Sequence, residues 1–288
     1  MRVLGLAVFY SLFLPLALVP YRLSAAVGRG VGLLLYLIKK KRRLIAIESI
    51  GGAIQRGALH EGLNPEETVK ESFMNLGRSL IEVIKIYYGT GRKILDSVSI
   101  EGAENFMRAR AKGRGVLFVT GHCGNWELLA LVLGMRLVKA NVLAKPLKNP
   151  YLNAVVEAMR TKFGNSVVHK KGAVRGILRA LKKGEAVGVL IDEAVPPEEG
   201  ILVDFLGRPA WTARMPALVA RRTSAPVLPA FIKRTATGHT ITVYPELELT
   251  GDEAEDTKRI SSSIEGYVKG HPDSWWLWIQ DRWRRAPY

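Results

Sequence analysis

A histidine and a glutamate stand five residues apart in segment 121–127, GHCGNWE, which carries the most chemistry per residue of any part of the chain. On one continuous helix His122 and Glu127 would point to different faces, because each residue turns the helix by about 100°. Gly121 and Gly124 permit a tight turn between them. Asn125 can cap a following helix, which puts Glu127 in its first turn. We therefore expect Glu127 to reach back to one imidazole nitrogen of His122.

Such a pair is suited to general base catalysis. A carboxylate on one ring nitrogen fixes the tautomer and stabilises the imidazolium. Neutral His122 can then take a proton from a substrate hydroxyl as that hydroxyl attacks an acyl carbonyl. Free backbone N–H groups at the start of the helix can bind the developing oxyanion.

Three other interpretations of the segment stay open. His122 can be an ordinary hydrogen-bonding residue of a glycine-rich turn, and Cys123 can be a nucleophile. His122, Cys123 and Glu127 are also possible zinc ligands, but the chain has one cysteine and no HExxH motif. We expect neither a metal nor a cofactor.

The surrounding pattern predicts a mostly parallel α/β fold with helices on both faces of a central sheet. The apolar run 116–120 has the look of a strand buried on both faces. Further strands are expected at 141–144, 166–169, 186–191 and 227–232, with helices at 126–139, 150–163, 173–183 and 212–223 between them. A strand at 240–244 should pair antiparallel with the one before it. A helix at 65–88 capped by Asn64 and closing helices at 253–269 and 273–284 complete the expected elements.

This arrangement puts segment 121–127 where a strand ends and a helix begins. Ligands and catalytic groups of open α/β sheets gather at the carboxyl ends of the strands. The fold class and the motif therefore agree on the place of the site.

The N-terminus and the charge point to a membrane. Segments 3–19 and 23–38 are almost wholly apolar, and five consecutive basic residues follow at 39–43, a flank typical of the cytoplasmic side. A cleaved signal peptide and a buried core helix are the alternatives. We expect an apolar membrane anchor at 1–38 and an α/β domain at 39–288.

The formal net charge of +16 attracts nucleic acid, anionic lipid or an acidic protein. No helix-turn-helix, RRM or zinc-finger signature is present, so we expect no nucleic-acid partner. The single cysteine excludes an internal disulfide and is compatible with a reducing cytoplasm.

Segment 121–127 resembles the His-x4-Asp/Glu box of the lysophospholipid and glycerol-phosphate acyltransferases, and its GHxGNWE form resembles the late acyltransferases of lipid A biosynthesis. Four further blocks are similar to that family in the same order. They are Glu71 to Arg78 (ESFMNLGR), Lys145 to Pro150 (KPLKNP), Val203 to Ala210 (VDFLGRPA), and His271-Pro272 followed by Trp275 to Trp283. Lys145 stands where the family has an arginine, and a lysine is a point charge rather than a planar fork.

The resemblance implies an O-acyltransferase of the cytoplasmic side of the inner membrane. It would move a fatty acyl chain from acyl carrier protein to a lipid A precursor, with His122 as general base and Glu127 as its partner. Asn125 and Trp126 would shape the turn, Lys145 would lie beside the cleft, and Asp192 would lie near the same cleft at the end of a later strand.

Arg208 and Arg214 are candidates for contacts with substrate phosphates, anionic lipid or the acidic carrier protein. A phosphatidylinositol mannoside acyltransferase remains the alternative. A membrane-tethered glycolipid-binding protein without turnover is the alternative of another class. The four tryptophans Trp275, Trp276, Trp278 and Trp283 suit a lipid–water boundary or a packed core equally well.

Overall fold

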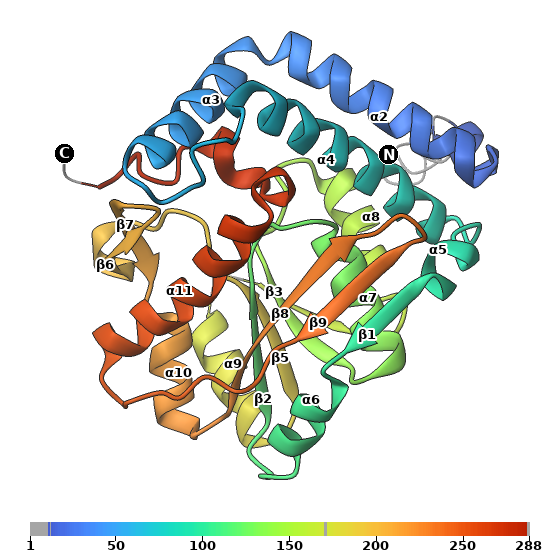
Figure 1. The fold of residues 1–288 in the computed structure, drawn as a ribbon. Coiled ribbons are helices and arrows are strands. Elements are labelled where there is room, and N and C mark those ends of the chain that lie inside the picture. Colours follow the sequence, from blue (N-terminus) through green and yellow to red (C-terminus); the bar gives the residue numbers. More distant parts are fainter. Residues whose placement is uncertain (1–10, 12, 170–171, 287–288) are drawn as a thin grey trace.

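A seven-stranded sheet forms the centre of the protein in the computed structural model, which describes residue 11 and residues 13–169 and 172–286 (Figure 1). The strand order is β1-β9-β8-β2-β5-β3-β4, and every neighbouring pair is parallel except β8 with β9. The strands are β1 Val98–Glu101, β2 Val116–Thr120, β3 Ala140–Ala144, β4 Ser166–His169, β5 Ala186–Leu190, β8 Val227–Arg234 and β9 His239–Val243. The predicted mostly parallel sheet and the antiparallel β8–β9 pair are confirmed.

Helices cover both faces of this sheet because the central strands are apolar on both sides. All five residues of β2 are buried. Leu117 and Val119 pack into one hydrophobic cluster, while Val116 and Phe118 pack into the other, as the alternation of side chains along a strand requires. The covering helices are α5 Arg92–Asp96, α6 Ala103–Arg110, α7 Trp126–Arg136, α8 Pro150–Arg160, α9 Ala173–Lys182, α10 Met215–Thr223 and α11 Glu253–Gly270.

A layer of N-terminal helices lies across the upper edge of the sheet in Figure 1, where β2 ends. It consists of α2 (Tyr21–Ile38), α3 (Lys40–Gln55) and α4 (Pro65–Tyr87). Asn64 caps α4 as predicted, since its side chain accepts a hydrogen bond from the backbone N–H of Glu67 at 3.1 Å. The helices α2 and α4 touch backbone to backbone, and a Cβ at Gly77 would lie 2.1 Å from the carbonyl oxygen of Gly28.

Within the described part of the chain, α2 is the single helix whose length and composition would let it cross a membrane. Most of the apolar segment predicted at 3–19 lies outside the described residues. The five basic residues that follow α2 open α3 rather than a loop, apart from Lys39 between the two helices.

Two predicted helices are wrong in part. Residues 212 and 213 belong to strand β7 (Arg208–Ala213), which forms a separate antiparallel hairpin with β6 (Gly200–Phe205), so α10 begins only at Met215. The helix predicted at 273–284 is replaced by two short 3₁₀ turns, η2 (Pro272–Ser274) and η3 (Trp276–Gln280). Two backbone groups of this segment bind the loop after β2, as described next.

Candidate active site

The loop between β2 and α7 contains the predicted turn. Gly124 has φ of 55°, and a Cβ there would lie 2.2 Å from the carbonyl oxygen of Ile232, so only glycine fits. Asn125 caps α7 by accepting a hydrogen bond from the backbone N–H of Leu128 at 3.1 Å. The sequence-based expectation of a strand, a glycine turn and a capped helix is therefore confirmed.

The C-terminal segment fixes the backbone of this loop. The N–H of Trp276 donates to the carbonyl oxygen of His122 at 2.9 Å, and the N–H of Gly124 donates to the carbonyl oxygen of Ser274 at 2.8 Å. Both bonds use backbone groups that a regular helix over 272–280 would pair internally. They hold the loop between β2 and α7 in place from outside the sheet.

Asp192, and not Glu127, is the carboxylate that binds the imidazole. Oδ1 of Asp192 lies 2.8 Å from Nδ1 of His122, and Oδ2 accepts the backbone N–H of His122 at 2.6 Å. The indole N–H of Trp275 also donates to Oδ2, at 2.8 Å. The Asp192 side chain has no exposed surface, whereas 19% of the His122 side chain is exposed.

The sheet order explains this contact. Strands β2 and β5 are parallel neighbours, and Thr120 pairs with Leu190 at their carboxyl ends. His122 and Asp192 each stand two residues beyond that pair, so the two side chains meet at the same edge. Gly121 leaves room for the carboxylate, because a Cβ there would lie 2.8 Å from Oδ2 of Asp192.

The prediction that Glu127 binds the imidazole of His122 is wrong. Glu127 does occupy the first turn of α7, but its carboxylate is held by the guanidinium of Arg160 at the end of α8, with Nε 2.9 Å from Oε2 and a second bond from Nη2. A bidentate arginine fork outcompetes a single ring nitrogen for both carboxylate oxygens. The ring of Trp126 lies edge-on to the His122 ring, with centroids 5.1 Å apart.

The charges around the ring make it more basic. Burial alone would lower the pKa of His122, but the charge and hydrogen bond of Asp192 outweigh burial, so the pKa of His122 is raised. Glu193 and Glu127 add smaller electrostatic contributions in the same direction. Burial would raise the pKa of Asp192, and the contacts with His122 and Trp275 instead lower it.

Cys123 is unsuited to nucleophilic chemistry. Its side chain is buried in the core, and burial, with a smaller contribution from the charge of Asp192, raises the pKa of the thiol well above its usual value. The thiolate is the reactive form of cysteine, so a buried neutral thiol is inert. The interpretation of Cys123 as a nucleophile is therefore wrong.

Three other predicted substrate residues lie on separate elements of the fold. Lys145 is exposed directly after β3, at the same edge of the sheet as His122. Arg208 begins β7 and lies over the ring of Trp283, 5.4 Å from its centroid, while Arg214 pairs with Glu253 of α11 at 3.7 Å. Among the described residues, no hydrogen bond or ion pair joins either arginine to His122, Glu127 or Asp192.

Sequence reasoning missed Trp275 and Arg160 as site residues. Trp275 belongs to the tryptophan cluster seen in the sequence, yet its indole, like those of Trp278 and Trp283, is buried, so a lipid–water boundary is wrong for these three. Nothing in the spacing distinguishes Arg160 from the other basic residues of the chain.

Comparison with known proteins assigns the chain to a family. The family model described as "Bacterial lipid A biosynthesis acyltransferase" matches residues 3–285. The chain is 25% identical to the lipid A biosynthesis palmitoleoyltransferase of Escherichia coli (strain K12), covering 93% of this chain and 87% of that protein. It is 26% identical to the lipid A biosynthesis lauroyltransferase of the same strain, with the same coverage. It is 28% identical to the phosphatidylinositol mannoside acyltransferase of Mycobacterium tuberculosis (strain H37Rv), covering 76% of this chain and 71% of that protein.

Proposed function

Because the chain belongs to the bacterial lipid A biosynthesis acyltransferase family and is an O-acyltransferase, we propose that it moves a fatty acyl chain from the thioester of acyl carrier protein to a hydroxyl of a lipid A precursor. The observation that supports this proposal is the environment of the two nitrogens of the His122 ring. Nδ1 is bound to the buried carboxylate of Asp192, and within the described residues Nε2 has no hydrogen-bond partner.

His122 acts as the general base through Nε2. With the proton on Nδ1 donated to Asp192, Nε2 carries the lone pair and takes the proton of the acceptor hydroxyl. The hydroxyl oxygen attacks the thioester carbonyl carbon, a tetrahedral oxyanion forms, and the C–S bond breaks as the ester forms. The imidazolium then returns its proton to the departing thiolate of the carrier, which restores His122.

The surroundings of the ring support this cycle. The charge of Asp192 stabilises the imidazolium that exists between the two proton transfers. Glu127, held by Arg160, contributes to the raised pKa of His122 through its negative charge. It is not a hydrogen-bond partner of the ring. Backbone N–H groups at the start of α7 bind the oxyanion.

The positive charge of the chain suits three anionic partners, namely the phosphates of the acceptor, the inner leaflet and acyl carrier protein. Lys145, at the edge of the sheet that carries His122, binds a phosphate of the acceptor. Arg208 and Arg214, in β7 and directly before α10, bind the carrier protein or the leaflet.

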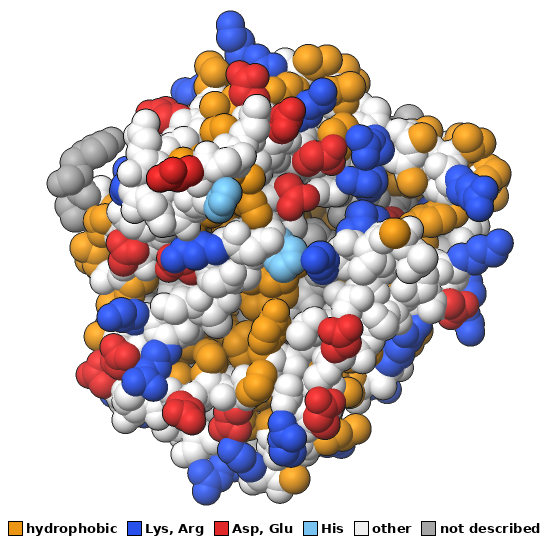
Figure 2. Space-filling model, viewed as in Figure 1, with side chains coloured by type: hydrophobic (Ala, Val, Ile, Leu, Met, Phe, Trp, Pro, Cys, Tyr) orange, Lys and Arg blue, Asp and Glu red, His pale blue; other side chains and the backbone are white. Residues whose placement is uncertain are grey.

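The helix α2 holds the enzyme on the cytoplasmic face of the inner membrane. Its small residues Ser24, Gly28 and Gly32 are buried, whereas large apolar residues elsewhere on it are exposed, including Leu23 (59%) and Leu34 (55%). Figure 2 shows hydrophobic side chains along the edge formed by α2 and basic side chains where α2 meets α3. A helix that packs on the protein with one face and offers leucines on the other inserts along the membrane surface.

Two other functions remain to be separated from this one. The similarity to a phosphatidylinositol mannoside acyltransferase supports a mannoside acceptor. A glycolipid-binding protein would use the same basic and apolar surfaces, but it would not need a histidine held by a buried carboxylate with its other nitrogen free.

Mass spectrometry of lipids from cells with and without the chain tests the acceptor. We expect lipid A from cells that make the protein to gain the mass of one acyl group. A gain on phosphatidylinositol mannosides instead would refute the lipid A assignment, and no gain on any lipid would contradict turnover.

A further inference from the structure

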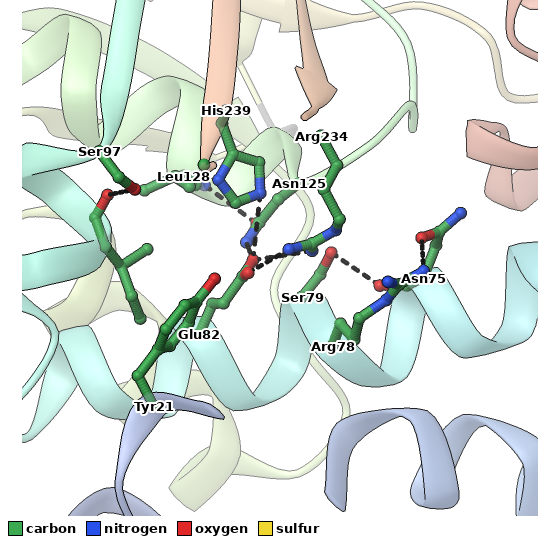
Figure 3. Close-up of polar contacts among 12 residues, drawn as sticks. Tyr21, Asn75, Arg78, Ser79, Glu82, Ser97, Asn125, Leu128, Arg234 and His239 are labelled. Carbon is green, nitrogen blue, oxygen red and sulfur yellow. Dashed lines mark hydrogen bonds and ion pairs between the residues drawn. The ribbon is translucent and has the colours of Figure 1, made fainter. Parts of the chain in front are cut away.

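A second buried carboxylate binds the catalytic loop. Asp192 binds the loop at His122, whereas this second carboxylate binds it at Asn125. Glu82 of α4 has a side chain that is 4% exposed, and Arg234 at the end of β8 binds both of its oxygens, with Nη2 2.9 Å from Oε2. The Nε2 atom of His239 lies 3.4 Å from Oε2. The amide Nδ2 of Asn125 donates to Oε2 at 2.9 Å, and Figure 3 shows these side chains converging from α4, the catalytic loop, β8 and β9.

We propose that Glu82 is a positioning residue for the acyl-transfer reaction, which acts by fixing the side-chain amide of Asn125 and thereby the catalytic loop. The proposal rests on the proposed function, in which His122 at the other end of that loop is the base. Among the described residues, no hydrogen bond joins Glu82 to His122 or Asp192.

The oxygen and the nitrogen of the Asn125 side-chain amide make different hydrogen bonds. Its Oδ1 accepts the N–H of Leu128 and so caps α7, while its Nδ2 donates to Glu82. An amide has nearly the same shape when flipped, so the acceptor at Glu82 is what specifies the capping orientation. Asn125 is buried, with 3% of its surface exposed, so bulk water cannot replace the carboxylate.

His122 and Asn125 are only three residues apart in the loop, so fixing Asn125 also restricts the position of His122. Gly124 is pressed against the carbonyl oxygen of Ile232, and Arg234, two residues further along β8, holds Glu82. The same carbonyl oxygen accepts the hydroxyl of Tyr267 at 2.9 Å. Strand β8 therefore fixes the loop twice, once directly at Gly124 and once through Glu82 and Asn125.

The charge state of Glu82 suits this role. Burial would raise the pKa of Glu82, but the nearby His239 and the hydrogen bonds and charge of Arg234 outweigh it and lower the pKa to about 2. Glu82 is therefore an anion at neutral pH. A neutral glutamine in its place would offer Asn125 a weaker acceptor with two possible orientations of its own.

The test is a double-variant cycle on the purified full-length protein with acyl carrier protein thioester and lipid A precursor. We expect Glu82→Gln to lower kcat by about 10- to 100-fold with little change in KM, because a misplacement of about 1 Å at a catalytic group costs that order. In the Asn125→Ala background the same substitution should change kcat by less than about twofold, because its route to the loop is already gone. Glu71→Gln, which removes another carboxylate of α4 that also binds an arginine, is the matched control and should keep its activity.

A readout that needs no substrate separates this proposal from the proposed function. The Nδ1 proton of His122, bound to Asp192, should give a low-field NMR signal that shifts or broadens in Glu82→Gln and not in Glu71→Gln. If the wild type proves to acylate another lipid, this comparison still decides the role of Glu82.

The proposal is overturned if kcat of Glu82→Gln stays within about twofold of the wild type, if the losses of the two variants multiply, or if the His122 signal is unchanged. Should Glu82→Gln fail to fold because Arg234 is left unpaired, the variant with both Glu82→Gln and Arg234→Gln removes the two charges together. The same thresholds then apply to that variant.

Discussion

Replacing Asp192 by asparagine tests which carboxylate serves His122. The substitution keeps the shape of the side chain and removes the charge. Oδ2 accepts two N–H groups, from His122 and Trp275, so the asparagine oxygen takes that place and its NH₂ group faces Nδ1 of His122. Nδ1 must then become the acceptor, which moves the ring proton to Nε2 and removes the lone pair that the reaction needs.

The size of the effect follows from the distance. Nδ1 and Oδ1 are 2.8 Å apart, and two unit charges whose centres lie about 4 Å apart interact by about 4 kcal/mol at an effective dielectric constant of about 20. About 1.4 kcal/mol corresponds to tenfold in rate. We therefore expect Asp192→Asn to lower kcat by about a thousandfold.

The assay is steady-state transfer of an acyl group from acyl carrier protein, measured alongside thermal unfolding of each variant. Glu193→Gln is the control, since this exposed neighbour acts on His122 through its charge alone; it should change kcat by less than about threefold. A folded Asp192→Asn protein with kcat within threefold of the wild type would refute the reasoning, and an equally large loss in Glu193→Gln would show that charge alone, and not the tautomer, matters.

Three further predictions concern the loop, the anion beneath it and the membrane helix. Gly124→Ala should abolish activity because its Cβ would meet a backbone carbonyl of β8, and residual activity above about a tenth would contradict the close approach. The pKa of Glu82 is lowered from 4.5 to about 2, so its ionised form stabilises the fold above about pH 4.5, and that contribution is lost as pH falls towards 2. The free energy of unfolding of Glu82→Gln, measured in urea, should therefore fall less steeply with pH across that window. A pH dependence equal to that of the wild type would be evidence against the buried anion. Leu34→Glu should weaken binding to vesicles containing anionic lipid by about 10- to 100-fold, whereas Met107→Glu on α6, at the other end of the sheet, should not; equal binding by both would contradict insertion of α2.

Local pattern was enough to predict the elements around the site. The apolar run of β2, the glycines that follow it and the cap at Asn125 are all properties of neighbouring residues, and the structure has them where expected. The sequence pattern places the start of α10 three residues too early, because residues 212–213 pair with β6, a partner that periodicity cannot reveal.

The partner of His122 depends on strand order, which no local pattern contains. Asp192 meets the imidazole because β5, and not β3, lies beside β2. The sequence places Asp192 at the end of a strand and Glu127 in the first turn of a helix, and from these facts alone the nearer carboxylate in the sequence looks like the better partner. Arg160, which takes Glu127 away, comes from α8 and becomes its neighbour only when the sheet has formed.

The C-terminal tryptophans illustrate the same limit. Their spacing fits a helix, but the backbone of this segment bonds to the loop between β2 and α7, and the indoles of Trp275, Trp278 and Trp283 fill the core. Long-range hydrogen bonds override local helix propensity here, because the buried backbone groups of the loop need partners that only this segment supplies.

The most direct test of the account is acyl transfer by His122→Ala, measured by mass spectrometry of the product with purified protein in vesicles. The account predicts a loss of at least about a thousandfold, with an unchanged melting temperature to within a few degrees and unchanged vesicle binding. Transfer at the wild-type rate by the folded variant would contradict the claim that the imidazole held by Asp192 is the base.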